Sequence, residues 1–379
     1  MFNIIILGIT SLLTDISSEM VYPILPVFLV SVLGASPAIL GLIEGIAESL
    51  SSLMKVFSGY WSDKIRRRLP FTIFGYSFSG VGKLFLYFAG TWHAVLLGRV
   101  LDRFGKGVRT APRDAIIADS APEGKRGASY GLHRAMDTAG AIIGVALAYF
   151  LVVTLKNPMR LIFLISLVPA ALGVAFLFLV KEKKTGPIPG RKIKLQWSAL
   201  DKRLKLFLIF TFIFTLGNSS NAFLLLKAQN AGNPLPTVIL LYLGYNIVYG
   251  IFAYPAAKLS DKVGRKKLLV TGYFFYGVVY FGFAMFSSLA AFWALFGIYG
   301  LYISFTEGVE KALVTDIAPP DLKATVIGLH ATLVGIGLLP ASFIAGLLWK
   351  FLGPAAPFYF GGFMGITASI GLWFILKGL

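Results

Sequence analysis

The sequence contains no cysteine, so disulfide bonds and thiolate metal sites are excluded. It also lacks a serine nucleophile elbow, a glycine-rich phosphate loop and a cluster of metal ligands. These absences predict a protein that is not an enzyme and that holds neither a cofactor nor a metal. Charge is scarce too: charged residues make up 14% of the chain, with 17 acidic side chains against 35 basic ones.

Apolar residues dominate what remains. They form 57% of the 379 residues, and the mean hydropathy is +0.78, as in a membrane protein. Apolar stretches of about 20 residues, enough to cross a bilayer as a helix, recur along the whole chain. Pro23 and Pro26 are expected to break or bend the first of them beside Glu19. The predicted spans are 3–33, 37–61, 70–91, 93–117, 127–154, 159–180, 204–226, 236–257, 267–287, 290–313, 324–349 and 353–376.

The chain contains an internal repeat. The segment around Asp63 returns around Asp261, 198 residues later, and Asp119–Pro122 returns 197 residues later as Asp316–Pro319. Two separate landmarks with one period indicate two copies of one unit. We therefore expect an all-α membrane protein with twelve transmembrane helices in two pseudo-symmetric six-helix halves. The halves are predicted at 1–180 and 204–379, joined by a cytoplasmic linker at 181–203.

Basic residues gather in alternate connections, at 64–68, 181–205 and 258–267. The positive-inside rule then places both termini in the cytoplasm of a multi-pass protein of the cell (inner) membrane. Much of the formal charge of +18 is this topological signal. Nucleic-acid binding, which would need a soluble basic face, is not expected.

The pattern Gly59-x-x-x-Asp63-x-x-x-Arg67 lies between the second and third spans, and a weaker copy holds Asp261 and Arg265. With two six-span halves and a basic central loop, it resembles the major facilitator superfamily, in particular its drug/proton antiporters. The resemblance implies secondary transport by alternating access. It also implies a conformational gate formed by Gly59, Asp63, Arg67, Asp261 and Arg265.

Several charged residues lie inside the spans, where each costs about 2.5–3.5 kcal/mol at a helix centre exposed to lipid. They are therefore expected to face protein or water. Glu19, Glu48 and Arg103 lie near the middle of their spans and are predicted to approach one another. On the fourth span the bases form one stripe, flanked by Gly98, Gly105 and Gly107, which suits close packing. The mid-membrane acids are Asp15, Glu19, Glu44, Glu48 and Asp102, and the bases are Lys55, Arg99, Arg103 and Lys106.

Five acids against four bases leave one carboxylate without a partner, and such a group can load and release a proton. In the repeat, Glu19 aligns with Asn221 and Glu48 with Asn246. The first half is therefore predicted to carry proton coupling, at Asp15, Glu19, Glu44, Glu48 and Asp102. The second half is predicted to offer substrate surface through Asn218, Asn221 and Asn246.

Two transport functions remain open at this point. The first is proton-coupled export of small amphipathic compounds. The second is symport or facilitated diffusion of a charged metabolite, siderophore or metal ion, with Arg99, Arg103 and Lys106 binding the substrate. The expected partners are a small-molecule substrate, protons or another coupling ion, and the lipid bilayer. Each chain is expected to work as a monomer.

Overall fold

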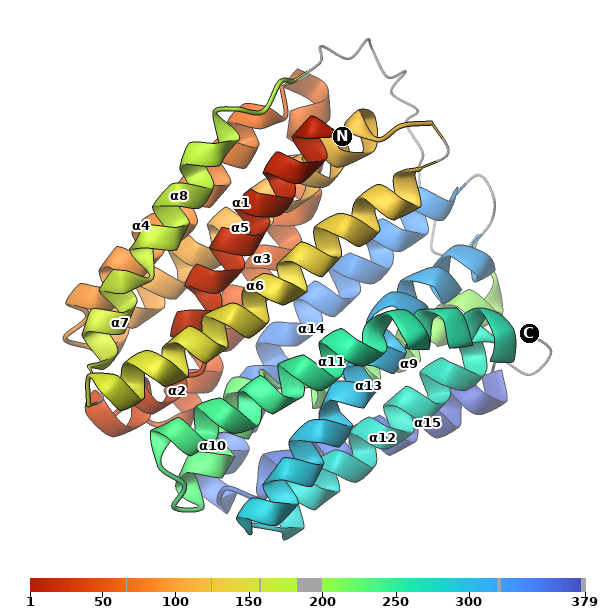
Figure 1. Cartoon of the computed structure of the whole chain (residues 1–379). Helices are drawn as coiled ribbons and strands as arrows, with labels where there is room; N and C mark the ends of the chain where they lie inside the picture. Colours follow the sequence, from red (N-terminus) through yellow and green to blue (C-terminus); the bar gives the residue numbers. More distant parts are fainter. Residues whose placement is uncertain (66, 124, 157, 183–199, 319–321, 376–379) are drawn as a thin grey trace. The chain divides into compact units, whose positions relative to one another are not determined.

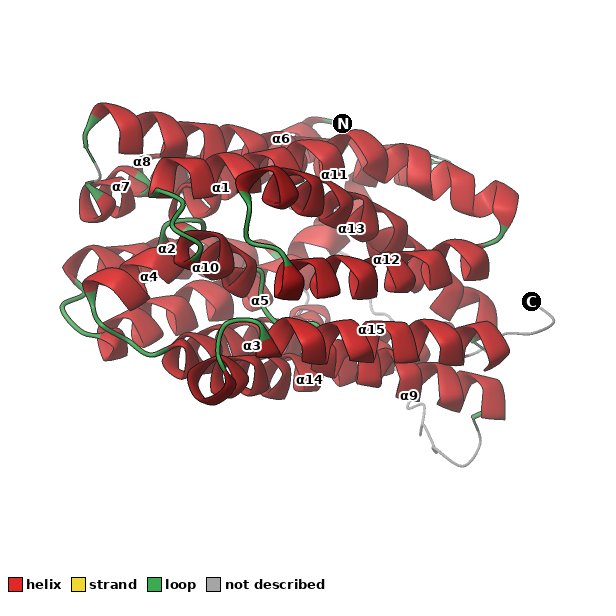
Figure 2. Ribbon diagram, turned by 90° about the horizontal axis from the view of Figure 1, so that it is seen from below, coloured by secondary structure: helices red, strands yellow, loops and turns green. Residues whose placement is uncertain are grey.

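The structure is a computed structural model of the chain. It describes residues 1–379 except 66, 124, 157, 183–199, 319–321 and 376–379. Most of the predicted linker at 181–203 therefore lies outside the described residues. The described residues form helices joined by short loops and contain no strand (Figure 2).

The first repeat forms six membrane-length elements. Its first and last elements are interrupted, because Pro23 lies in the turn between α1 and α2, and Ser166 separates α7 from α8. The predicted break beside Glu19 is thus confirmed. The helical segments that make up these six elements are α1 (Phe2–Val21), α2 (Leu25–Val27), the π-helical η1 (Phe28–Val32), α3 (Pro37–Ile65), α4 (Leu69–Phe88), α5 (Trp92–Ser120), α6 (Arg126–Thr154), α7 (Met159–Ile165) and α8 (Leu167–Leu177).

The second repeat also forms six membrane-length elements, and its first is likewise interrupted, between Gly217 and Ala222. Each of the twelve predicted spans overlaps one long helix or a consecutive run of shorter ones. The helical segments of the second repeat are α9 (Lys202–Gly217), α10 (Ala222–Asn230), α11 (Leu235–Val263), α12 (Arg265–Met285), α13 (Leu289–Ile317), α14 (Lys323–Leu352) and α15 (Ala356–Ile375).

Nine of the described helical segments are long and apolar enough to cross a membrane. The helices α3, α4 and α5 are not among them. Of these, α3 carries Glu44, Glu48 and Lys55, and α5 carries the basic stripe. Two of the three helices without this membrane signal, α3 and α5, are therefore those that carry Glu44, Glu48 and the basic stripe of the predicted site.

Contacts between helices divide the chain into two compact units. Unit 1 contains residues 1–35, 46–189 and 234–243, and unit 2 contains 36–45, 190–233 and 244–379. Each unit is thus mostly one repeat plus a ten-residue segment from the other. The two exchanged segments are equivalent in the repeat, because Ser36 and Pro234, like Gly45 and Leu243, are 198 residues apart.

Helix pairing within each unit follows the repeat. In unit 1, α1 packs along α6 and α8, and α4 packs along α5 and α8 (Figure 1). In unit 2, the corresponding helix α9 packs along α14 and α15, and α12 packs along α13 and α15. The two repeats therefore use the same set of helix contacts.

Candidate functional site

An ion pair between α3 and α5 lies at the centre of the charged residues of unit 1. Arg103 Nε lies 3.0 Å from Glu48 Oε1, and Arg103 is buried while the Glu48 side chain is 32% exposed. Asp102 adds a second acid, 3.5 Å from Arg99 and 4.0 Å from Arg103. The predicted approach of Glu48 and Arg103 is confirmed.

Glycines on α5 bring its backbone against the neighbouring helices. A Cβ atom on Gly105 would lie 2.4 Å from the Gly75 carbonyl oxygen of α4, and one on Gly107 would lie 2.5 Å from Met54 Cβ of α3. Neither position leaves room for a side chain. The predicted close packing at the flanks of the basic stripe is therefore confirmed, and it brings α5 against both α3 and α4.

Glu19 lies near the same bases and has its own hydrogen-bond donor. The hydroxyl group of Tyr242 donates to Glu19 Oε2 over 3.1 Å, from the segment of α11 that belongs to unit 1. Lys106 and Arg103 are the positive charges nearest to the Glu19 carboxylate in electrostatic effect, so Glu19 shares the bases of the Glu48 site. The Tyr242 ring also lies 5.6 Å from that of Tyr22, so the polar group sits beside an aromatic pair.

Lys83 on α4 is a buried base that the sequence interpretation missed. It is 2% exposed, and its ammonium group donates to Ser17 Oγ at 2.5 Å and to Ser18 Oγ at 3.2 Å. The count of five acids against four bases was therefore wrong, because Lys83 is a fifth base among them. The only signal in the sequence was a lone lysine in the middle of a span, which carries no spacing pattern.

The other predicted coupling acids lie in different surroundings. Asp15 is half-buried on α1, where its carboxylate interacts electrostatically with the charges of Asp137 and Lys106. Glu44 is fully buried and accepts a hydrogen bond of 3.0 Å from Ser220 Oγ, within unit 2. Glu44 and Glu48 thus belong to separate units although they are one helical turn apart.

Two of the three predicted amides of the second repeat contact tyrosines in unit 2. Asn221 Oδ1 accepts a hydrogen bond of 2.7 Å from Tyr299, and Asn218 Nδ2 donates to the Tyr302 oxygen over 3.4 Å. Asn246 is 7% exposed. Asn218 and Asn221 flank the interruption between α9 and α10, the kind of broken helix at which transporters build substrate sites.

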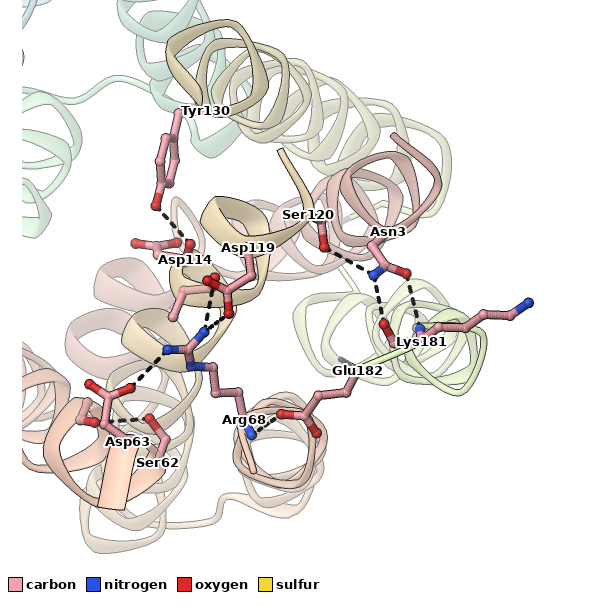
Figure 3. Close-up of polar contacts among 12 residues, drawn as sticks. Asn3, Ser62, Asp63, Arg68, Asp114, Asp119, Ser120, Tyr130, Lys181 and Glu182 are labelled. Carbon is pink, nitrogen blue, oxygen red and sulfur yellow. Dashed lines mark hydrogen bonds and ion pairs between the residues drawn. The ribbon is translucent and has the colours of Figure 1, made fainter. Parts of the chain in front are cut away.

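A second polar cluster lies between α3 and α4, and it joins the predicted gate residue Asp63 to Arg68, the neighbour of the predicted gate residue Arg67. Arg67 is exposed, whereas its neighbour Arg68 is 8% exposed and contacts both Asp63, at 3.1 Å, and Asp119 (Figure 3). The backbone N–H of Arg68 also donates to Glu182. The five-residue spacing of Asp63 and Arg68 arises because the turn, rather than one continuous helix, brings them together.

The second repeat contains the same arrangement. Arg265 lies 3.4 Å from Asp261 and 2.5 Å from Asp316. Both arginines also reach a backbone carbonyl oxygen at the equivalent position, Ala115 at 3.4 Å for Arg68 and Ala312 at 3.3 Å for Arg265. Arg265 therefore corresponds to Arg68 rather than to Arg67. Within the described residues, no group of three or more histidines, cysteines or acids could hold a metal ion.

Comparison with known families matches residues 7–226 and 206–378 to the Major Facilitator Superfamily. An uncharacterized MFS-type transporter of Methanocaldococcus jannaschii is 41% identical to the chain over 98% of its length and 94% of the relative. The chain belongs to the Major Facilitator Superfamily. It is accordingly a multi-pass membrane transporter of a small molecule and not an enzyme.

Two further comparisons agree with this family. Multidrug resistance protein MdtH of Proteus mirabilis is 24% identical over 81% of this chain and 77% of its own. The crystal structure of the nucleoside transporter NupG superposes with a TM-score of 0.81 over the whole of both chains, at 13% identity. This last likeness concerns the fold alone, which is the superfamily fold of twelve transmembrane helices in two halves.

Proposed function

We propose that the protein is a proton-coupled exporter of small amphipathic compounds that works by alternating access. The Glu48–Arg103 ion pair carries this proposal, because it joins two helices through a charge that one proton can remove. With Glu48 neutral, Arg103 loses its closest acid, and the contact between α3 and α5 weakens. The likeness to a multidrug resistance protein supports the substrate class.

Glu19 is a second proton acceptor in the proposal. Its hydrogen bond from Tyr242 joins α1 to the segment of α11 that belongs to unit 1. In the proposal, Asp15 and Asp102 add negative charge near the Glu19 and Glu48 carboxylates. Glu44 is hydrogen-bonded to Ser220 in unit 2. Asn218 and Asn221, with their tyrosine neighbours, and the buried Asn246 supply the surface for the compound.

The test uses purified protein in liposomes, with ethidium as the amphipathic probe and an imposed pH gradient. Glu48→Gln and Glu19→Gln are each expected to lower pH-driven ethidium transport at least about 10²-fold, the lower end of what a positioned proton-transfer group contributes. Glu307→Gln is the matched control. Like Glu19, Glu307 accepts a hydrogen bond from a tyrosine, in this case 2.5 Å from Tyr249, but it belongs to unit 2. Full pH coupling in both test variants contradicts the assignment.

A second candidate function, transport of an anionic metabolite, is favoured by the excess of buried bases in unit 1. Lys83, Arg99, Arg103 and Arg109 are each less than 9% exposed. Arg103→Ala separates the two candidates. Lost coupling with substrate affinity kept supports proton-coupled export, whereas lost affinity for one anion supports the second function.

The positive connections support a cell (inner) membrane protein with both termini in the cytoplasm. A reporter fused after the last helix tests this orientation. A six-plus-six chain contains both halves of an alternating-access transporter, so we propose that it acts as a monomer.

A further inference from the structure

An apolar groove opens on unit 1 between α3, α4 and α5, on a face that the proposed transport function does not use. Its volume is about 750 Å³, which falls within the usual size of ligand pockets. Met54, Phe57 and Trp61 line it from α3, Phe71 and Phe74 from α4, and Phe104 from α5.

The walls and floor of the groove offer almost nothing polar. Ser58 is the polar residue of the lining, and its hydroxyl donates to the Gly107 carbonyl oxygen over 3.1 Å, so it is already satisfied. One wall is aromatic, with the ring of Phe104 lying 6.5 Å from that of Phe74. A ligand in the groove must therefore be a hydrocarbon over most of its length.

The rim of the groove is exposed. Phe57 is 55% exposed, Trp61 57% and Phe74 45%. In a membrane protein such a rim faces acyl chains, and a tryptophan is typical of headgroup depth. The groove is therefore open to a lipid chain along its side.

The chain between the two walls of the groove is basic. Along α3 the lining runs from Met54 to Trp61, and the exposed bases Lys64 and Arg67 follow before Pro70 begins the opposite wall on α4. The nearby acid Asp63 pairs with Arg68. Apolar walls that lead to exposed bases match the two parts of an anionic lipid, and basic sites at one end of membrane helices bind such headgroups.

We propose that this groove binds an anionic phospholipid, with one acyl chain along the aromatic walls and the phosphate group at Lys64 and Arg67. The site belongs to the first repeat alone. At the positions equivalent to Phe57, Trp61 and Phe74, the second repeat has Pro255, Leu259 and Thr271, although it keeps a lysine, Lys262, at the position of Lys64.

Native mass spectrometry of the purified full-length protein tests the headgroup. With equal amounts of dioleoyl phosphatidylglycerol and dioleoyl phosphatidylcholine, the protein is expected to retain the anionic lipid preferentially. Lys64→Gln and Arg67→Gln should each lower that preference about 5-fold, and Lys262→Gln should leave it unchanged. Equal retention of the two lipids, or an unchanged preference in the Lys64→Gln/Arg67→Gln variant, overturns the proposal.

Fluorescence quenching tests the position of the chain and does not depend on the charge variants. Phosphatidylglycerol with brominated acyl chains should quench the fluorescence of the native protein more than that of Trp61→Phe. Equal quenching places the chain elsewhere and overturns the groove as its site. Displacement of the lipid by ethidium makes the groove a substrate site and also overturns the proposal.

Discussion

At the scale of single residues, burial forces each charged group of unit 1 to find a specific partner. A buried ammonium group without oxygen neighbours is strongly disfavoured, and Lys83 meets this need with two serine hydroxyls of α1. The Ser17 hydroxyl in turn donates to the Ser166 carbonyl oxygen at the interruption between α7 and α8. Lys83 thus ties three membrane elements together through one short chain of hydrogen bonds.

Lys83→Met should lower the stability of the protein, because it removes two hydrogen bonds to a charged donor. Such bonds contribute roughly 1.5–3 kcal/mol each, and part of this is regained by burying an apolar side chain. We expect a net loss of about 2 kcal/mol, seen as a lower melting temperature in detergent. A melting temperature equal to that of the native protein contradicts a structural role for this contact. Lys156→Met, at an exposed lysine in a loop, is the control.

Spacing along the chain predicted some residue contacts and missed others. Glu48 and Arg103 were predictable, because both lie at mid-span on helices whose charges cannot face lipid. The partners of Lys83 were not, because serine hydroxyls carry no charge pattern and lie on a distant part of the chain. The choice of Arg68 over Arg67 depends on the path of the turn before α4, which spacing does not specify.

At the scale of helices, glycine decides where backbones touch. Within unit 2, the first turns of α3 press on α14: a Cβ atom on Gly41 would lie 2.2 Å from the Ser342 carbonyl oxygen, and one on Gly45 would lie 2.7 Å from that of Leu339. Both contacts are with backbone atoms, which cannot move aside as a flexible side chain does. This contact joins the exchanged segment 36–45 to its unit.

Gly45→Ala is expected to destabilise the protein by about 1–3 kcal/mol, the usual cost of overpacking. Gly80→Ala is the matched control, since it makes the same change within a helix at a site with no atom within 4 Å of the added carbon. That control should be neutral or gain up to about 1 kcal/mol from helix propensity. Thermal unfolding of the two variants measures the difference. Equal melting temperatures contradict the backbone contact as the reason for glycine.

Helix positions were predictable because a bilayer demands about 20 apolar residues and proline interrupts the pattern visibly at Pro23. The interruption between α9 and α10 was not predicted. It contains Asn218, Ser219, Ser220 and Asn221 and no proline, and Tyr299 donates a hydrogen bond to Asn221 there. The hydrophobic pattern of the sequence does not reveal such an interruption.

At the scale of the whole molecule, the repeat was the most informative signal in the sequence. It predicted the two pseudo-symmetric halves, because duplicated sequences fold alike. It did not predict that segments 36–45 and 234–243 join the opposite units, since that depends on packing between helices far apart in the chain. The two repeats differ in charge, because the position of Arg103 in the first repeat is occupied by Gly300 in the second.

The duplicated Asp–Arg–Asp clusters make a prediction that compares the two halves of the chain. Arg68 and Arg265 each bridge two aspartates, but the Arg68 side chain is 10% exposed and that of Arg265 is 31% exposed. Removing Arg68, the more buried arginine, leaves two carboxylates without their positive partner in a less hydrated site. At the Arg265 site, solvent screens the repulsion between the two carboxylates. Arg68→Gln should therefore reduce transport and melting temperature more than Arg265→Gln.

Arg67→Gln supplies the control that separates this structural assignment from the sequence pattern. Since Arg67 is exposed, its loss should leave the melting temperature and transport close to native. The three variants, compared in the same liposomes and by the same thermal scan, rank the arginines directly. If Arg67→Gln impairs transport as strongly as Arg68→Gln, then the signature arginine acts through a contact other than the Asp63–Arg68–Asp119 cluster, and the greater importance predicted for Arg68 is wrong.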